Sequence, residues 1–92
     1  MRLTMPRFYF DLFNGHGEVR DEEGSDLADQ AAARTLALDS IRSMVSEDVG
    51  KGIIDLTGRI DVKNHDRALL LSVNYMEAFQ VRIPRDAGRS GE

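Results

Sequence analysis

One amphipathic helix is the feature of the sequence that most limits what the chain can fold into. Apolar residues recur there with the spacing of a single helical face: Ala33, Leu36, Ala37, Ile41, Met44, Val45 and Val49. Gly50 and Gly52 follow, and glycine is typical of the position just past the last helical turn. About twenty residues at ~1.5 Å each make a rod roughly 30 Å long. The rest of the chain must therefore supply a layer that covers one face of one long helix.

Two predicted hairpins flank this helix and supply that layer. Residues 7–14, RFYFDLFN, and 18–21, EVRD, are expected to be strands joined by the turn NGHG. Residues 59–63, RIDVK, alternate polar and apolar side chains, and residues 68–74, ALLLSVN, return after the turn NHDR. Residues 75–84, YMEAFQVRIP, fit either a further strand or a helical turn, and the proline at their end stops both.

The order β-β-α-β-β, with a possible fifth strand at the C-terminal end, predicts an α+β fold. We expect a two-layer sandwich in which the long helix packs on a small sheet. The 92 residues leave room for one domain. We expect that domain to span residues 6–83, after an N-terminal extension at residues 1–5. Residues 84–92, rich in glycine, serine and charges, are expected to be a flexible tail.

Five carboxylates between Asp21 and Asp29 stand just ahead of the helix and admit two interpretations. In the first they open the helix, because its N-terminus carries about half a positive charge and unpaired N–H groups. Asp29 is then the N-cap, and Asp26 or Ser25 takes that place if the helix begins one turn earlier. In the second they bind Ca²⁺ or Mg²⁺, which need several oxygen ligands. The spacing matches no EF-hand loop, so we favour capping.

Few other residues are candidates for metal binding or catalysis. The two histidines, His16 and His65, fall in turns at opposite ends of the predicted sheet. They lie roughly 16–23 Å apart there, too far to share one zinc ion. One end of the sheet gathers a weak candidate site for a cation or small ligand: Asp21, Glu22, His65 and Asp66. The serines show no nucleophile elbow, so we predict neither enzymatic activity nor a cofactor.

Composition indicates the cellular compartment of the protein and argues against some classes of partner. The chain has no cysteine, so it forms neither disulfides nor thiolate metal sites. The first ten residues lack the apolar region of a signal peptide, and no apolar run reaches the ~18 residues of a membrane span. We therefore expect a cytoplasmic protein that does not enter a membrane. A net charge of −4 and singly scattered basic residues argue against a nucleic-acid partner.

Apolar side chains on both faces of two strands are the feature that most needs explaining. In residues 7–14, Tyr9 and Phe13 alternate with a second set of apolar residues. In the last predicted hairpin, Leu70 likewise points away from its apolar neighbours. One helix covers only one face of a sheet. We therefore expect Tyr9, Phe13 and Leu70 on the open face.

Three explanations account for such an open face. The segment that contains Tyr75, Met76 and Phe79 folds across it, two copies of the chain stack or pair edge to edge, or another protein binds it. Burying two aromatic residues and a leucine per chain would contribute several kcal/mol, at ~1.5–3 kcal/mol per large side chain. For the homodimer, the predicted interface residues are Tyr9, Phe13, Leu70 and Met76.

The start MPRFYFDLFNG, followed by RDEEGSDLADQAAARTLAL, resembles an uncharacterised family of small proteins from rhizobia and related alphaproteobacteria. Members open with Met-Pro-Arg, two aromatic residues and Phe-Asp. They continue with Asp-x-x-Gly, an acidic-Leu-x-Asp step and an Ala-Ala-Arg helix. Gly58-Arg59-Ile60 and ALLLSV match their later strand and hairpin, so the resemblance covers about residues 5 to 80. It implies that Met5 is the usual start, and it assigns no activity or catalytic residue.

These observations favour a small non-enzymatic interaction module that homodimerises or binds a protein partner. The alternative from another class is an antitoxin-like regulatory protein, by analogy of fold alone. A third hypothesis is a weak binder of a divalent cation or small ligand at the turns.

Overall fold

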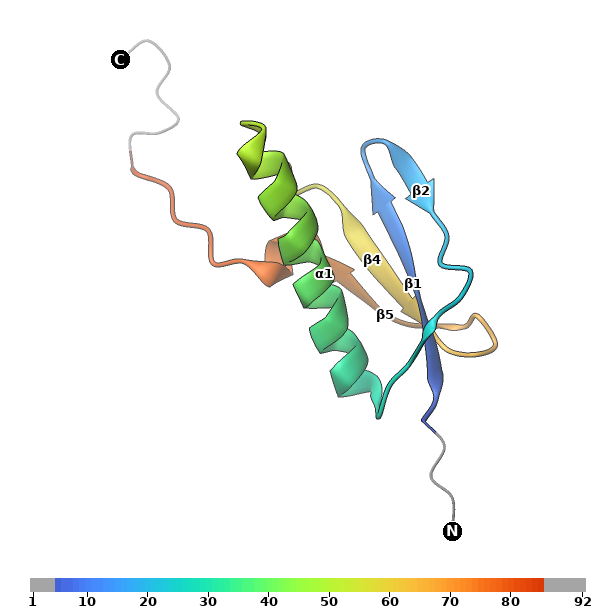
Figure 1. Ribbon diagram of the computed structural model, residues 1–92. Helices are drawn as coiled ribbons and strands as arrows, with labels where there is room; N and C mark the ends of the chain where they lie inside the picture. Colours follow the sequence, from blue (N-terminus) through green and yellow to red (C-terminus); the bar gives the residue numbers. More distant parts are fainter. Residues whose placement is uncertain (1–4, 86–92) are drawn as a thin grey trace.

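The computed structural model describes residues 5–85, so residues 1–4 of the expected extension and 86–92 of the expected tail lie outside the described residues. The elements run in this order: β1 (Arg7–Asn14), β2 (Gly17–Val19), β3 (Ser25–Asp26), α1 (Gln30–Gly50), β4 (Arg59–Lys63), β5 (Leu69–Asn74) and the 3₁₀-helix η1 (Tyr75–Ala78). The predicted α+β class is confirmed, because an open antiparallel sheet of five strands carries one long helix (Figure 1).

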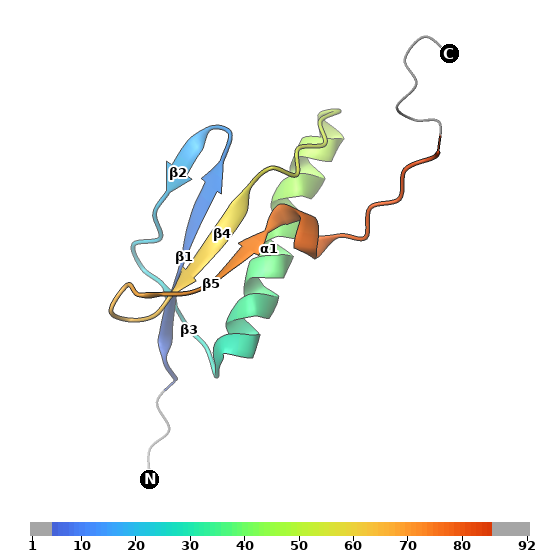
Figure 2. The ribbon, with the colours of Figure 1, turned by 180° about the vertical axis from the view of Figure 1, so that it is seen from behind.

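Four strands lie side by side in the order β2-β1-β4-β5, and each neighbouring pair is antiparallel. The register places Phe10 opposite Val62 and Leu12 opposite Ile60. Ile60 in turn lies opposite Val73 of β5. Since side chains alternate along a strand, these residues share one face, which is the face that α1 covers. Figures 1 and 2 show α1 on that side of the sheet only, nearer to β4 and β5 than to β2.

The fifth strand is not the C-terminal one that the sequence suggested. It is β3, whose two residues pair with Arg7 and Phe8 at the start of β1, on the same edge as β2. No sequence pattern predicts a strand at this place. The C-terminal candidate strand is instead η1, followed by chain that joins no strand within the described residues. Of the two possibilities for this segment, the helical turn is the one that forms.

A capping box turns the chain from β5 into η1. The backbone N–H of Asn74 donates to Oε2 of Glu77 at 2.9 Å, and Oε1 of Glu77 pairs with Arg34 of α1 at 3.1 Å. Arg42 of α1 donates from Nε to the carbonyl oxygen of Ala78 at 2.9 Å. These contacts hold η1 against α1, on the covered side of the sheet. The C-terminal segment therefore does not cross the open face, and that explanation of the open face is wrong.

The core lies between α1 and the sheet. Buried residues of α1 form a single stripe, as the periodicity predicts: Ala33, Ala37, Ile41 and Val45. The sheet and η1 supply the other buried apolar residues: Phe8, Ile60, Val62, Val73, Tyr75 and Ala78. Val49, which the periodicity also placed on this stripe, is 50% exposed because it lies in the last turn, past the buried residues. No helix within residues 5–85 is long and apolar enough to span a membrane.

The start of α1 is fixed by one side chain and one backbone contact. Asp29 is the N-cap, and its Oδ1 accepts a hydrogen bond from the N–H of Ala32 at 2.8 Å. The N–H of Leu27 donates to the carbonyl oxygen of Pro6 at 3.0 Å, which ties the entry of the helix to the chain just before β1. Of the five carboxylates ahead of α1, only Asp29 caps it, and the other four serve elsewhere or face solvent.

Gly58, just before β4, lies directly against the ring of Tyr75. A Cβ at this position would come within 2.6 Å of Cζ of Tyr75 and 2.9 Å of the carbonyl oxygen of Phe13. We expect Gly58→Ala to lower the free energy of unfolding by about 1–3 kcal/mol, because the ring and the backbone must move apart. Urea denaturation measures the change.

The control for this prediction is Gly50→Ala, since a Cβ at Gly50 meets nothing within 4 Å. Alanine favours the helix, so this variant should be as stable as the parent chain or up to about 1 kcal/mol more stable. Equal effects of the two substitutions would contradict the packing of Tyr75 on Gly58.

Candidate functional site

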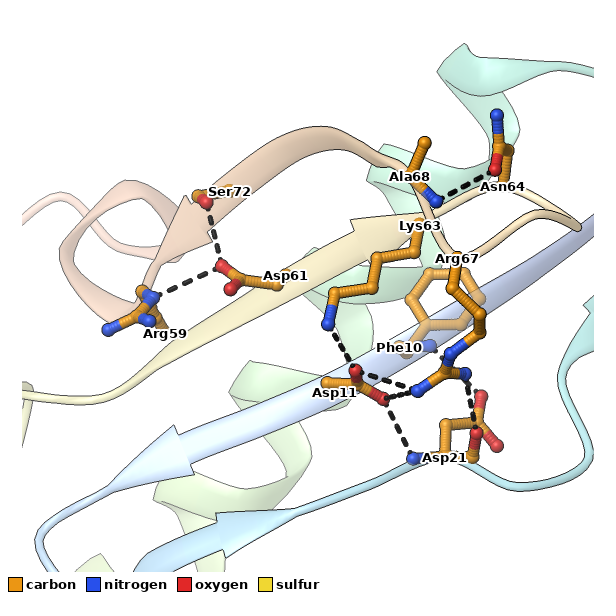
Figure 3. A network of polar contacts seen from close by, with 10 residues as sticks. All are labelled: Phe10, Asp11, Asp21, Arg59, Asp61, Lys63, Asn64, Arg67, Ala68 and Ser72. Atoms are coloured by element: carbon orange, nitrogen blue, oxygen red, sulfur yellow. Dashed lines mark hydrogen bonds and ion pairs between the residues drawn. The ribbon is translucent and has the colours of Figure 1, made fainter.

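The open face of the sheet is covered by charged side chains of the chain itself (Figure 3). Asp11 of β1 lies opposite Asp61 of β4 on this face, and both are buried, with 0% and 8% of their surface exposed. Burying a carboxylate is unfavourable unless it is paired, so the partners of these two residues define the site. We call the set the open-face network: Asp11, Asp21, Arg59, Asp61, Lys63, Arg67 and Ser72.

Two cations and one backbone donor hold Asp11. Nζ of Lys63 lies 2.8 Å from its Oδ2, and Nη2 of Arg67 donates to both carboxylate oxygens at 3.2 and 3.0 Å. The N–H of Asp21 donates to Oδ1 at 2.9 Å. Burial would raise the pKa of Asp11, but the Lys63 and Asp21 donors and the two cationic charges outweigh it and lower the pKa. The carboxylate is therefore ionised at neutral pH and fully engaged, unlike a general base.

Arg67 reaches Asp11 from a turn with an unusual backbone conformation. Its φ is 66°, in the left-handed region that few residues other than glycine and asparagine adopt. Asn64 holds the turn, because its Oδ1 accepts hydrogen bonds from the N–H groups of Asp66 and Ala68, both at 2.9 Å. The turn thus carries the guanidinium back over the sheet.

Asp21, the first of the five carboxylates, fastens a loop. Its Oδ2 accepts from the N–H of Phe10 at 3.0 Å. Its Oδ1 accepts from the N–H groups of Glu23 and Gly24 at 3.3 and 3.1 Å. Its carbonyl oxygen accepts from Arg67 at 3.0 Å. Oδ2 therefore holds the loop after β2 against β1, and Oδ1 fixes the turn within that loop.

The weak candidate cation site at this end of the sheet is not assembled. His65 and Asp66 pair with each other at 3.3 Å, and both side chains are 74% exposed. Asp21 is engaged with the backbone, and Glu22 is exposed. Within the part of the chain that the structure describes, no three His, Asp or Glu side chains gather as metal ligands do. His16 lies past the far end of β1, remote from His65 in the register of the sheet.

Two arginines cover the aromatic rings of the open face. Cζ of Arg59 lies 4.2 Å from the centroid of the Phe13 ring, and Cζ of Arg67 lies 4.7 Å from that of Tyr9. Arg59 also donates from Nε to Oδ1 of Asp61 at 3.1 Å. From the sequence, we expected a second segment or a second chain over these rings. Instead, charged side chains of the same face shield them, and both rings are half-buried.

The sequence carried part of the signal for this network. Arg59, Asp61 and Lys63 stand at alternate positions of β4 and therefore share one face, and Asp11 stands between the two open-face aromatics of β1. The register places Asp11 opposite Asp61, a like charge, and Lys63 reaches Asp11 from the diagonal position, so pairing β1 with β4 would have predicted that Asp11 needs a cation from β4. No sequence pattern predicted the contact of Arg67 with Asp11, because that contact depends on the backbone conformation of the turn that contains Arg67.

β5 forms a free edge of the sheet. It pairs with β4 on one side, and no strand within residues 5–85 pairs with it on the other. Its six residues, LLLSVN, include neither proline nor a charged side chain, the usual protection of an edge. A register shift opposite its first half is its one irregularity. Leu69 at its start is 57% exposed, and Met76 just past its end is 53% exposed. Leu70, which we expected on the open face, is instead half-buried and packs against the core, so that prediction is wrong.

An open hollow of about 360 Å³ lies beside this edge. Leu71 and Ser72 of β5 line one side, and the first turns of α1 line the other with Gln30, Ala31 and Arg34. The lining combines apolar and polar side chains. We call β5 together with this hollow the β5 edge site. An extended peptide segment suits such a site, because it pairs with the strand and places alternate side chains in the hollow.

Comparison with known proteins confirms the resemblance to an uncharacterised family. The family model described as a domain of unknown function (DUF6894) matches residues 7–76, which include every helix and strand from β1 to β5. The chain belongs to this family. No curated protein and no solved structure matches the chain significantly.

Removing the charge of Asp11 should destabilise the fold. We expect Asp11→Asn to lower the free energy of unfolding by about 1–3 kcal/mol, because it leaves Lys63 and Arg67 without their shared carboxylate. Asp26→Asn, which breaks an exposed ion pair with Arg7, should have a much smaller effect. Chemical denaturation measures both variants. Equal losses would show that Asp11 is no more important than a surface charge.

The same carboxylate should make stability depend on pH. Its pKa lies below the ordinary value of 3.8 in the folded chain, so the unfolded chain binds more protons as the pH falls. The contribution of Asp11 is therefore complete above about pH 5 and is lost as the pH falls through its folded pKa. Between pH 5 and 3, the stability of the parent chain should fall more steeply than that of Asp11→Asn. Parallel curves would contradict the lowered pKa.

Proposed function

We propose that this member of the DUF6894 family is a non-enzymatic interaction module that self-associates through the β5 edge site. The observation that carries the proposal is an unpaired strand of six residues beside an open hollow. The free side of such a strand presents a row of backbone donors and acceptors that pair readily with another chain. The exposed Leu69 and Met76 at its two ends add apolar surface to the same contact.

The opposite edge of the sheet is a weaker candidate for the contact. There β2 and β3 have three and two residues, and the loop that Asp21 fastens separates them. Arg7 and Asp26 form an ion pair across the end of this edge at 2.8 Å. Short strands and charged side chains are features that keep an edge from pairing with other chains. β5 is therefore the edge best suited to association.

The open-face network argues against the face of the sheet as the contact. A second sheet stacked there would displace Arg59 and Arg67 from the rings that they cover. It would also take charges that are already paired further from water, which is unfavourable without new partners. We therefore place the proposed contact on β5, which contains Leu70, and on Met76 just after β5. Tyr9 and Phe13 of the open face are no longer part of it.

The titratable groups near the β5 edge site support binding rather than catalysis. Ser72 lines the hollow, and its hydroxyl donates to Oδ1 of Asp61 at 2.7 Å. The same oxygen accepts a hydrogen bond from Nε of Arg59 at 3.1 Å. Arg34 at the rim pairs with Glu77. Each of these charges is therefore already paired within the chain.

Sedimentation velocity of the full chain tests the proposal. We expect a dimer that Leu69→Lys converts to a monomer, because a lysine on an edge strand opposes the addition of another strand. The matched control is Ile54→Lys, at a residue that is 75% exposed in the connection between α1 and β4. It adds the same charge away from β5 and should leave the dimer intact.

Other outcomes of this experiment are equally informative. A parent chain that sediments as a monomer across the micromolar range would refute self-association. A dimer that survives Leu69→Lys but dissociates with Phe13→Asp would place the contact on the open face. Thermal melts of each variant establish that the monomers remain folded.

A further inference from the structure

The segment after η1 is extended, exposed and apolar on one side. We call residues 79–85, FQVRIPR, the C-terminal arm. Phe79 anchors its start with φ −136° and ψ 151°, half-buried against the core. Val81 and Ile83 are 43% and 69% exposed. Arg82 donates to Oε1 of Gln80 at 3.3 Å, so these polar side chains lie together and the apolar ones occupy the alternate positions.

The arm leaves its own domain. Figures 1 and 2 both show it running from η1 away from the sheet and from α1. The ties of η1 to α1, through Glu77 to Arg34 and through Ala78 to Arg42, start the arm on that outward course. In the described part of the chain, Phe79 packs against the core, while Val81 and Ile83 on the same side of the arm stay largely open to solvent. An extended segment with alternating apolar residues is what a strand presents before it joins a sheet.

We propose that the C-terminal arm of one copy pairs with β5 of a second copy, and that two copies exchange arms reciprocally. This inference rests on the proposed self-association and names the segment that occupies the β5 edge site. A reciprocal exchange uses the same two surfaces on both copies, as a two-fold dimer requires. Both the arm and the β5 edge are unpaired in the described chain. In the exchange, each becomes the partner of the other.

The dimensions of the arm and the edge agree. The five residues from Phe79 to Ile83 span about 16 Å when extended, and the six residues of β5 span about 20 Å. Pro84 follows, and proline cannot donate to the hydrogen-bond ladder of a sheet, so the pairing ends there. On β5, the hollow beside Leu71 receives the apolar side chains of the arm. Gln80 and Arg82 then face solvent.

Charge variants of the arm in the full chain test the inference. Val81→Asp with Ile83→Asp should raise the dissociation constant of the dimer at least about tenfold, because both apolar side chains of the contact become charged. Gln80→Glu with Arg82→Gln changes the net charge by the same amount on the other side of the arm. It should leave the constant within about threefold of the parent value.

Mixing two defective chains provides a second measurement. The Val81→Asp/Ile83→Asp chain keeps an intact edge, and the Leu69→Lys chain keeps an intact arm. Each alone should be monomeric, and an equimolar mixture should form a heterodimer that is weaker than the parent dimer. A peptide of residues 79–85 in excess should dissociate the parent dimer, and the same peptide with the two aspartates should not. The peptide needs no change in the protein, so it also serves if a variant fails to fold.

The results separate this inference from the proposal on which it rests. If the arm variant dimerises like the parent while Leu69→Lys is monomeric, the β5 edge is the contact and the arm is not its occupant. If the parent chain is monomeric at every concentration, both proposals fail. An arm variant that dissociates together with its charge-matched control would assign the effect to net charge and overturn the arm exchange.

Discussion

The pairing of the buried Asp11 is the interaction on which the arrangement of this small sheet depends. Asp11 lies in the middle of β1, and its partners come from three other parts of the chain: Lys63 ends β4, Arg67 lies in the turn after β4, and Asp21 lies in the loop after β2. An unpaired carboxylate at this depth would be strongly destabilising. The two hairpins and the loop are therefore drawn together at one point, which also keeps Arg67 over Tyr9.

This network changes what the surface of the protein can do. α1 covers one face of the sheet, and charged side chains of the chain itself lie over the aromatic rings of the other. The edges are left. One edge is broken into the short β2 and β3, and the other, β5, is longer, uncharged and next to a hollow. An apolar arm that leaves the same domain completes a pair of surfaces that lack partners within the described chain.

Local patterns explain which parts of this structure the sequence predicts. The helical stripe, the N-cap Asp29 and the two hairpins follow from spacings within a few residues of each other. Even η1 had a local signal, because Asn74 and Glu77 are spaced as a capping box. The open-face network joins Asp11 to Arg67 across 56 residues, and no local pattern specifies that contact. For this reason, the sequence pattern predicted that another segment or another chain covers the open face, whereas Arg59 and Arg67 lie over its rings.

The pairing of β1 with β4 has a consequence for how the chain acquires its structure. These central strands lie on either side of α1 in the sequence, and an isolated two-stranded hairpin is marginal in water. Neither half of the chain therefore makes a stable sheet before the other is present, and such distant contacts slow folding. During synthesis, the aromatic strand β1 has only the short β2 and β3 to pair with until β4 has left the ribosome, which exposes the nascent protein to aggregation in that interval.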